Sequence, residues 1–278
     1  MRIKARNFDL KRTVEGGQIF NYAVEDGHYY IIHSNSVIKI SQPSPQIIEF
    51  ETYPNRGSAD LVKSLLNYNA DYLSIVKKYI KNRKIRFSYE KYSGVKICQL
   101  EPWECLIGFI CSQMNNIKRI RKMVIFLSEK FGDEVEYDGK KFHLFPSAGQ
   151  LANADPHKLA SCNLGYREKY LIDAAKAVSN GFDFQKLRKM DYAHAKRGLM
   201  MLPGIGEKVA DCVLLFSLGF TEAFPVDVWI KRIMQKMYFK GRNVPENKIA
   251  QFARKTFGKD AAVVHEFLFA NREELAGK

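Results

Sequence analysis

A lysine and an aspartate lie close to a glycine-rich turn in the second half of the chain. Residues 202–206 (Leu-Pro-Gly-Ile-Gly) connect two segments with helical spacing of apolar residues, and Lys208 and Asp227 follow. Gly204 and Gly206 allow a tight turn and leave unpaired amides at the start of the next helix. With the positive end of that helix, these amides form an anion site that suits a DNA phosphate. A plain tight connection between two helices is the alternative interpretation.

The two charged side chains supply complementary chemistry. Lys208 lies in the first turn of its expected helix, where the positive helix end favours the neutral amine, and a neutral amine is a nucleophile. Asp227 follows Pro225 at the start of the next expected helix and brings a carboxylate to the same region. Taken singly, the lysine could be a surface residue that contacts phosphate and the aspartate a simple N-cap. Together they place an amine and a carboxylate beside one phosphate-binding turn.

The charge balance indicates a polyanionic partner. Lysine and arginine number 44 against 30 acidic residues, a net charge of +14, in a chain of 278 residues. Nucleic acid is the commonest such partner, and solubility alone is the simpler explanation. Basic residues gather at 77–96 and 231–259, interleaved with aromatic residues. Such segments support phosphate contact without locating it, because charge runs are usually solvated faces.

Composition also limits the compartment. No run of about 18 apolar residues occurs, which argues against a membrane span, and the basic N-terminus lacks the apolar stretch of a secretory signal. The five cysteines are odd in number and irregularly spaced, so a disulfide framework is not expected. We therefore expect a cytoplasmic protein, associated with the nucleoid if the source is bacterial.

The pattern of apolar residues predicts an α+β chain. Strands are expected at 20–24, 29–33, 37–40 and 47–50, the first two joined by an Asp26-Gly27 turn, which together form an antiparallel sheet. Residues 60–66 and 71–81 have helical spacing, and from Pro102 onward the chain consists of predicted helices, including one at 208–218. We expect a sheet-rich domain at 1–98 and an all-helical body at 99–278.

Several motifs together resemble one family of DNA repair enzymes. They are residues 202–212 (LPGIGEKVADC), 225–228 (PVDV), 104–112 (ECLIGFICS) with 115–117 (NNI), 164–167 (LGYR) with Tyr170, and 17–20 (GQIF). The chain resembles the helix-hairpin-helix DNA glycosylases with a Gly/Pro-Asp loop, and within them the 8-oxoguanine DNA glycosylases. The resemblance runs from about residue 17 to 269 and implies two helical subdomains with the active site in the cleft between them.

The resemblance implies a bifunctional glycosylase and lyase. Lys208 would attack C1′ of the damaged nucleoside, form a Schiff base and cleave the strand by β-elimination, with Asp227 as the supporting carboxylate. The nucleotide must leave the stack to be reached. Two alternatives stay open: an endonuclease III-like glycosylase for oxidised pyrimidines, and a non-catalytic helix-hairpin-helix protein that binds DNA.

The resemblance also assigns a base pocket. The Gly17 carbonyl would accept the N7–H that distinguishes 8-oxoguanine from guanine. Cys212 and Phe269 would cover the two faces of the base, Pro225 would contact it, and His265 stands where the family more often has a glutamine that reads the guanine edge. The alternatives are a turn glycine at Gly17 and core packing for Cys212 and Phe269.

Other residues would hold the DNA around the lesion. Arg119 and Arg167 match residues that read the cytosine opposite it, and Tyr166 matches a wedge. Met114 replaces an asparagine of the usual pattern, which predicts weaker selectivity for the opposite base. The remaining expected DNA contacts are Gly204, Gly206 and Val209 of the hairpin together with Asn115 and Asn116.

No cofactor is expected. Some relatives hold an iron–sulfur cluster with four closely spaced C-terminal cysteines, but only Cys212 lies beyond residue 162. The six histidines show no close ligand spacing, so no metal site is expected. A monovalent or divalent cation between the hairpin and the phosphate stays open. The expected partner is double-stranded DNA containing oxidised guanine, bound by a monomer.

Overall fold

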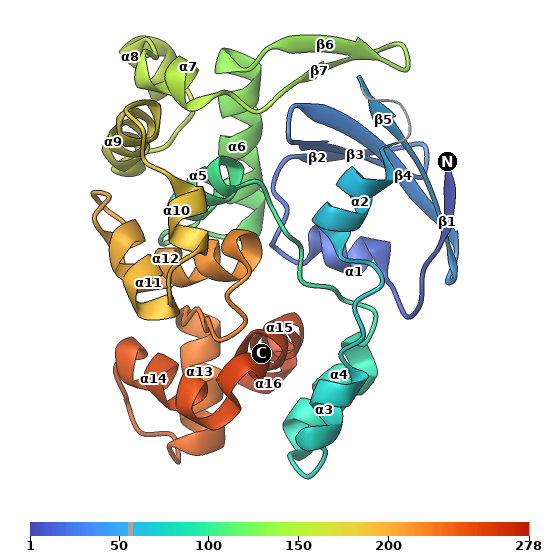
Figure 1. The fold of residues 1–278 in the computed structure, drawn as a ribbon, viewed down its shortest axis with the longest axis vertical. Helices are drawn as coiled ribbons and strands as arrows, with labels where there is room; N and C mark the ends of the chain where they lie inside the picture. The colour runs from blue at the N-terminus through green and yellow to red at the C-terminus, as the bar shows by residue number, and fades with distance from the viewer. Residues whose placement is uncertain (55–57, 278) are drawn as a thin grey trace.

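The first part of the chain forms one antiparallel sheet in a computed structural model that describes residues 1–54 and 58–277. Its strands lie in the order β1-β5-β4-β3-β2 (Figure 1). They are β1 (Arg2–Lys4), β2 (Tyr22–Glu25), β3 (His28–His33), β4 (Ser36–Ser44) and β5 (Ile47–Tyr53). The turn between β2 and β3 has positive φ at Asp26 and Gly27, as the Asp-Gly pair predicts.

Two strand details differ from the prediction. β4 does not end at Ile40 but continues past Pro43 to Ser44, and its register with β5 shifts between Ser41 and Ser44. Proline cannot donate to a ladder, and the irregular register accommodates it. β1 pairs with the far side of β5 and was not predicted, because three residues are too short to show alternation.

Each face of the sheet is covered by a different element. Helices α1 (Leu10–Glu15) and α2 (Ala59–Leu66) pack their apolar residues on the face that carries Ile31, Ile38 and Ile48. The opposite face, with Tyr30 and Val37, packs against a hairpin of β6 (Glu134–Tyr137) and β7 (Lys140–His143), which lies beside the sheet in Figure 1.

The β6–β7 hairpin corrects the prediction of an all-helical body. Its sequence alternates apolar and polar residues and turns at Asp138-Gly139, both with positive φ. That is the same hairpin signal as at residues 26 and 27, inside a region expected to be helical. The Tyr30 and Phe142 rings stack at 5.2 Å, which joins the hairpin to the sheet.

The rest of the described chain is helical and confirms the predicted fold class. Its elements are α3 (Leu73–Lys78), α4 (Arg83–Tyr92), α5 (Pro102–Cys111), α6 (Ile117–Phe131), α7 (Ala148–Ala152), α8 (Pro156–Ala160), α9 (Arg167–Ser179), α10 (Phe184–Arg188), α11 (Tyr192–Met200), α12 (Glu207–Val213), η1 (Leu214–Leu218), α13 (Val228–Tyr238), α14 (Glu246–Phe257), η2 (Gly258–Asp260), α15 (Ala261–Ala270) and α16 (Arg272–Ala276). No helix among the described residues is long and apolar enough to cross a membrane.

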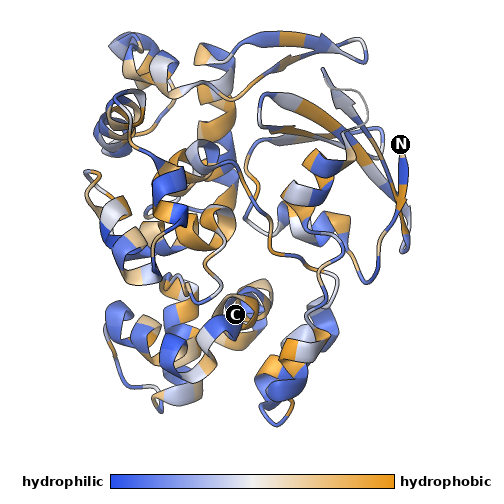
Figure 2. Cartoon of the chain, viewed as in Figure 1, coloured by the Kyte–Doolittle hydropathy of each residue, from blue (hydrophilic) through white to orange (hydrophobic). Residues whose placement is uncertain are grey.

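The helices surround two apolar cores. One core joins α5, α6, α9 and α12, and the other joins α4 with α13, α14 and α15. In Figure 2 most outer helices carry hydrophobic and hydrophilic residues side by side, as expected of helices with one buried face. Helix α4 was not predicted, because only Ile85 and Ser88 of its highly charged sequence are buried.

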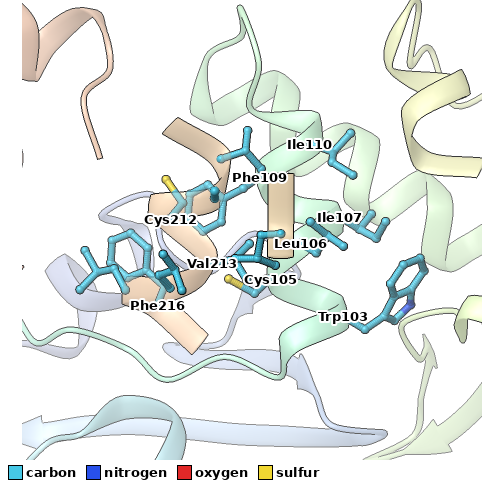
Figure 3. Packing of buried hydrophobic residues seen from close by; sticks show 14 of the residues in the cluster. Trp103, Cys105, Leu106, Ile107, Phe109, Ile110, Cys212, Val213 and Phe216 are labelled. Carbon is cyan, nitrogen blue, oxygen red and sulfur yellow. The ribbon is translucent and has the colours of Figure 1, made fainter. Parts of the chain in front are cut away.

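Packing between α5 and α12 fixes the hairpin helix. Eight of the ten α5 residues are buried, and Figure 3 shows Phe109 of α5 close to Cys212 and Phe216. The Phe109 and Phe216 rings stack at 5.4 Å. The predicted helix at 208–218 is α12 followed by one wider turn, η1. Helix α12 packs on the apolar helix α5, and the Lys208 amine lies 5.1 Å from the centre of the Phe109 ring.

Candidate active site

The turn between α11 and α12 has the geometry of a helix-hairpin-helix. Gly204 has φ +76°, and a Cβ built there would lie 2.1 Å from the Tyr170 ring, so no other residue fits. Gly206 is the N-cap of α12 and no side chain caps that helix. The first amides of α12 are therefore open to an anion, with the positive end of the helix behind them.

Helix α5 ties the hairpin to the rest of the site. Gln113, just beyond its end, donates from Nε2 to the Gly204 carbonyl at 2.9 Å. The carbonyl of the same glutamine accepts from Arg167, whose Nε lies 2.9 Å away. One residue thus links the hairpin with the start of α9. Sequence reasoning missed it because a lone glutamine carries no motif.

Lys208 is half-buried on the cleft side of α12. Its Nζ donates to the Ser112 Oγ at 2.7 Å and lies 5.1 Å from the centre of the Phe109 ring. The hydroxyl and the ring hold the amine in one place. Neither partner was predicted from the sequence. Ser112 could have been singled out, because it is the first polar residue after an apolar helix in the matched motif 104–112.

A second functional group on α12 is an uncharged thiol. Cys212 follows Lys208 by one helical turn and is buried. Burial raises the pKa of the Cys212 thiol to about 12, with a smaller opposing effect of Lys208. The thiol therefore presents a small, polarizable, neutral surface to the cleft and carries no competing nucleophile at neutral pH.

Asp227 performs the capping role and also lines the cleft. Its side chain accepts from the Ile230 N–H at 2.8 Å as the N-cap of α13. The residue is half-buried and lines the same cleft as Lys208, so the two interpretations of Asp227 are compatible. The cap fixes where the carboxylate lies, because the helix start cannot move without breaking that bond.

A single cleft of about 1100 Å³ brings most of the predicted site residues together. Its lining includes the predicted residues Gly17, Asn115, Asn116, Arg119, Gly204, Gly206, Lys208, Val209, Cys212, Pro225, Asp227, His265 and Phe269. Tyr166 and Arg167 do not line it. The residues that do line the cleft come from the N-terminal domain, from both apolar cores of the helical body and from the hairpin.

One wall of the cleft joins the two ends of the chain. Gly17 has φ +98°, and a Cβ there would lie 2.8 Å from Ile117 Cδ1 and 3.7 Å from Phe269 Cε1. The Phe269 ring in turn stacks on His265 with centroids 6.0 Å apart, and the Arg272 guanidinium lies 4.4 Å from its centroid. The absence of a side chain at residue 17 is what allows this close approach.

His265 is a neutral imidazole in this wall. Burial lowers the pKa of His265 to about 3, and the ring makes a hydrogen bond with the backbone of Pro225. Proline has no N–H, so its carbonyl is the acceptor and the ring donates. Nδ1 has no partner among the described residues, which leaves Nε2 as the donor and Nδ1 as a buried acceptor.

The asparagines beside the cleft shape its entrance. Asn116 caps α6 by accepting from the Arg119 N–H at 3.1 Å, and Asn115 donates to the Cys111 carbonyl at 3.0 Å. Met114 before them has φ +47° and is 89% exposed. The Arg119 side chain is exposed at the mouth of the cleft.

Arg167 is placed differently from the other predicted arginine. It is buried, and its guanidinium donates to the carbonyls of Gln113, Met114 and Leu164. It also lies 4.6 Å from the ring centre of Tyr166, which is half-exposed. In this arrangement Arg167 supports the loop at 113–114, and Tyr166 stands beside that loop.

Metal-binding side chains do not gather in the described part of the chain. No group of three or more histidine, cysteine, aspartate or glutamate residues there could hold a metal ion, and all five cysteines are free and buried. In the hairpin, the carbonyls of Leu202 and Gly204 each accept a hydrogen bond from the protein.

Comparison with known proteins identifies the family. Residues 107–259 match the HhH-GPD superfamily of base excision DNA repair proteins, and residues 1–106 match the N-terminal domain of 8-oxoguanine DNA glycosylases. The chain therefore belongs to the HhH-GPD superfamily, with the N-terminal domain of its 8-oxoguanine glycosylases. This confirms the family that the motifs indicated.

Relatives match over nearly the whole length. A probable N-glycosylase/DNA lyase of Methanothermobacter thermautotrophicus is 28% identical over 301 residues, 97% of this chain and 95% of that protein. The structure of MBOgg1 with a low-affinity DNA ligand has a TM-score of 0.91 at 32% identity, covering 99% of this chain and 94% of that one. The Clostridium acetobutylicum 8-oxoguanine glycosylase/lyase, bound to DNA with cytosine opposite 8-oxoguanine, has a TM-score of 0.89 at 28% identity, covering 99% and 98%.

Proposed function

We propose that this DNA glycosylase and lyase excises 8-oxoguanine from duplex DNA and then cleaves the strand at the same site. The observation that carries the proposal is one cleft that holds Lys208, Asp227 and the open amides of the hairpin. The hairpin binds a backbone phosphate, and the damaged nucleotide rotates out of the stack into the cleft.

Lys208 is the proposed nucleophile. Its amine attacks C1′, the C1′–N9 bond breaks, and the base leaves with a proton transferred from the amine. Opening of the sugar ring gives a Schiff base between Nζ and C1′, and loss of a C2′ proton then expels the 3′ phosphate. Ser112 and Phe109 orient the amine, and Asp227 stabilises the positive charge that develops on the sugar.

The base pocket is proposed to distinguish 8-oxoguanine by one hydrogen bond. The Gly17 carbonyl accepts N7–H of 8-oxoguanine, whereas guanine presents a bare N7 acceptor and is repelled. Cys212 and Phe269 cover the faces of the base. His265 lines the same cleft, where the family more often has a glutamine that reads the guanine edge.

We further propose a preference for cytosine opposite the lesion, weakened by Met114. Arg119 is exposed at the cleft mouth and donates to cytosine acceptors, while Arg167 holds the neighbouring loop and Tyr166, beside that loop, is the wedge. Arg119→Ala should lower excision opposite cytosine more than opposite adenine. Equal losses opposite both bases would rule out Arg119 as a reader.

Two further expectations complete the proposal. The enzyme acts as a monomer on one lesion, which light scattering with and without DNA would test. A monovalent or divalent cation between the hairpin and the phosphate stays open, and no proposed step depends on it.

The direct test is excision from a duplex with one 8-oxoguanine opposite cytosine, with thymine glycol and undamaged duplexes as controls. Release of 8-oxoguanine alone, followed by strand cleavage, is the expected result. Release mainly of thymine glycol would overturn the substrate and support the pyrimidine-specific alternative. DNA binding without base release, unaffected by Lys208→Arg, would support a binding protein.

A further inference from the structure

A buried hydrogen bond connects the two walls of the cleft from behind. Gln18 follows Gly17, is 1% exposed, and donates from Nε2 to Glu266 Oε1 at 3.0 Å. Glu266 is 2% exposed and lies on α15, between His265 and Phe269. The bond therefore joins the N-terminal glycine wall to the aromatic wall across 248 residues of sequence.

Other contacts of Gln18 fix which way its amide points. The Cys98 N–H donates to Gln18 Oε1 at 2.8 Å, and Nε2 also donates to the Lys96 carbonyl at 2.9 Å. Rotating the amide by half a turn would place oxygen against a carbonyl and nitrogen against an N–H. The Gln18 nitrogen must therefore face α15, and the residue at position 266 must offer it an acceptor.

Glu266 meets that requirement as a neutral acid. Burial raises its pKa to about 8, and Arg272 on α16 opposes the rise. Tyr72 before α3 and the thiol of Cys98 are the other titratable groups whose charge couples to it. Oε2 has no hydrogen-bond partner among the described residues, and Oε1 is the oxygen that accepts from Gln18.

We propose that Glu266 is a positioning residue for base discrimination: through Gln18 it holds the Gly17 carbonyl at a fixed place opposite Phe269. This inference rests on the proposed function, because it assumes that Gly17 reads the base. A hydrogen bond to N7–H requires a donor–acceptor distance of about 2.7–3.2 Å, and a misplacement of about 1 Å can cost a hundredfold in rate. Gly17 has no side chain of its own to anchor it, so the anchor is its neighbour.

The test compares two substitutions of similar size. Glu266→Gln keeps an acceptor oxygen for Gln18, whereas Glu266→Met fills the space without one. Each variant is assayed for excision of 8-oxoguanine, excision of guanine, and cleavage of a duplex with a preformed abasic site. The abasic substrate has no base to read, so its cleavage rate corrects each variant for folded fraction and for Lys208 chemistry.

For Glu266→Met we expect the excision rate for 8-oxoguanine, divided by the abasic cleavage rate, to fall at least about tenfold. The preference for 8-oxoguanine over guanine should fall with it, and Glu266→Gln should keep both within about threefold of the wild type. Equal losses of excision and abasic cleavage in Glu266→Met, or unchanged preference, would overturn the positioning role. Absence of 8-oxoguanine excision by the wild type would instead refute the proposed function.

Discussion

Glu266→Gln should change how the stability of the fold depends on pH. A glutamate whose pKa is raised from 4.5 to about 8 in the folded state stabilises the fold fully below pH 4.5, and that contribution is lost as pH rises through 8. Each pKa unit corresponds to about 1.36 kcal/mol, so the full loss is up to about 5 kcal/mol. Glutamine cannot ionise and avoids the loss.

The assay is urea unfolding of both proteins at pH 5 and pH 9. The free energy of unfolding of Glu266→Gln, relative to the wild type, should rise by several kcal/mol between the two pH values. Glu129→Gln makes the same chemical change at an exposed position of α6 and serves as the matched control. A constant difference between Glu266→Gln and wild type at both pH values would show that Glu266 is not buried as a neutral acid.

Three further substitutions test the groups around the cleft. Because the pKa of His265 is lowered to about 3, the wild type loses stability as pH falls below 6.5, and His265→Gln does not. The free energy of unfolding of His265→Gln, minus that of the wild type, should therefore be about 2 kcal/mol larger at pH 5 than at pH 8. Gly204→Ala should destabilise the fold by roughly 2–4 kcal/mol and weaken DNA binding, because its Cβ overlaps the Tyr170 ring. Lys196→Met should lower the free energy of unfolding by roughly 3–5 kcal/mol in urea, because the buried Asp211, 3.0 Å from Nζ, loses its cationic partner and keeps only the Tyr192 hydroxyl as a side-chain donor.

Each of these has an outcome that would contradict it. If the free energy of unfolding changed with pH in the same way for the wild type and His265→Gln, burial would not lower the pKa of the imidazole. For Gly204→Ala the control is Gly181→Ala, because Gly181 also has positive φ but open space around a Cβ. Equal losses of stability at both glycines would show that overlap with the Tyr170 ring is not the cause. The double variant Lys196→Met with Asp211→Leu should be more stable than Lys196→Met alone. Equal stabilities would mean that the loss in Lys196→Met does not come from the Asp211 carboxylate.

Local patterns predicted much of the fold, and most of the site residues suggested by the motifs and the family resemblance line the cleft. The Asp26-Gly27 turn, the glycines of the hairpin and the apolar spacing of the helices depend on neighbours in sequence, so they could be read directly. The same turn signal occurs at Asp138-Gly139, but it stands within a long stretch of helical spacing, so the sequence did not predict a hairpin there. Helix α4 was missed since its few buried residues give little apolar periodicity.

The partners of the site residues could not be predicted in the same way. The Lys208–Ser112 and Gln18–Glu266 bonds join residues 96 and 248 positions apart, and only the folded chain brings them together. The partners of Arg167 were not predicted either. The sequence suggests that this arginine contacts DNA, whereas in the structure its guanidinium donates to backbone carbonyls. Burial is a property of tertiary packing, so the neutral states of Glu266 and His265 also needed the structure.

The central claim is that Lys208 forms a covalent bond with the sugar of an excised 8-oxoguanine nucleotide. Borohydride reduces a Schiff base to a stable amine, so it should trap the protein on a duplex with one 8-oxoguanine opposite cytosine. We predict a cross-linked species on that duplex alone, absent in Lys208→Gln although the variant still binds the DNA. An undiminished cross-link in Lys208→Gln would contradict it, because another amine would then be the nucleophile.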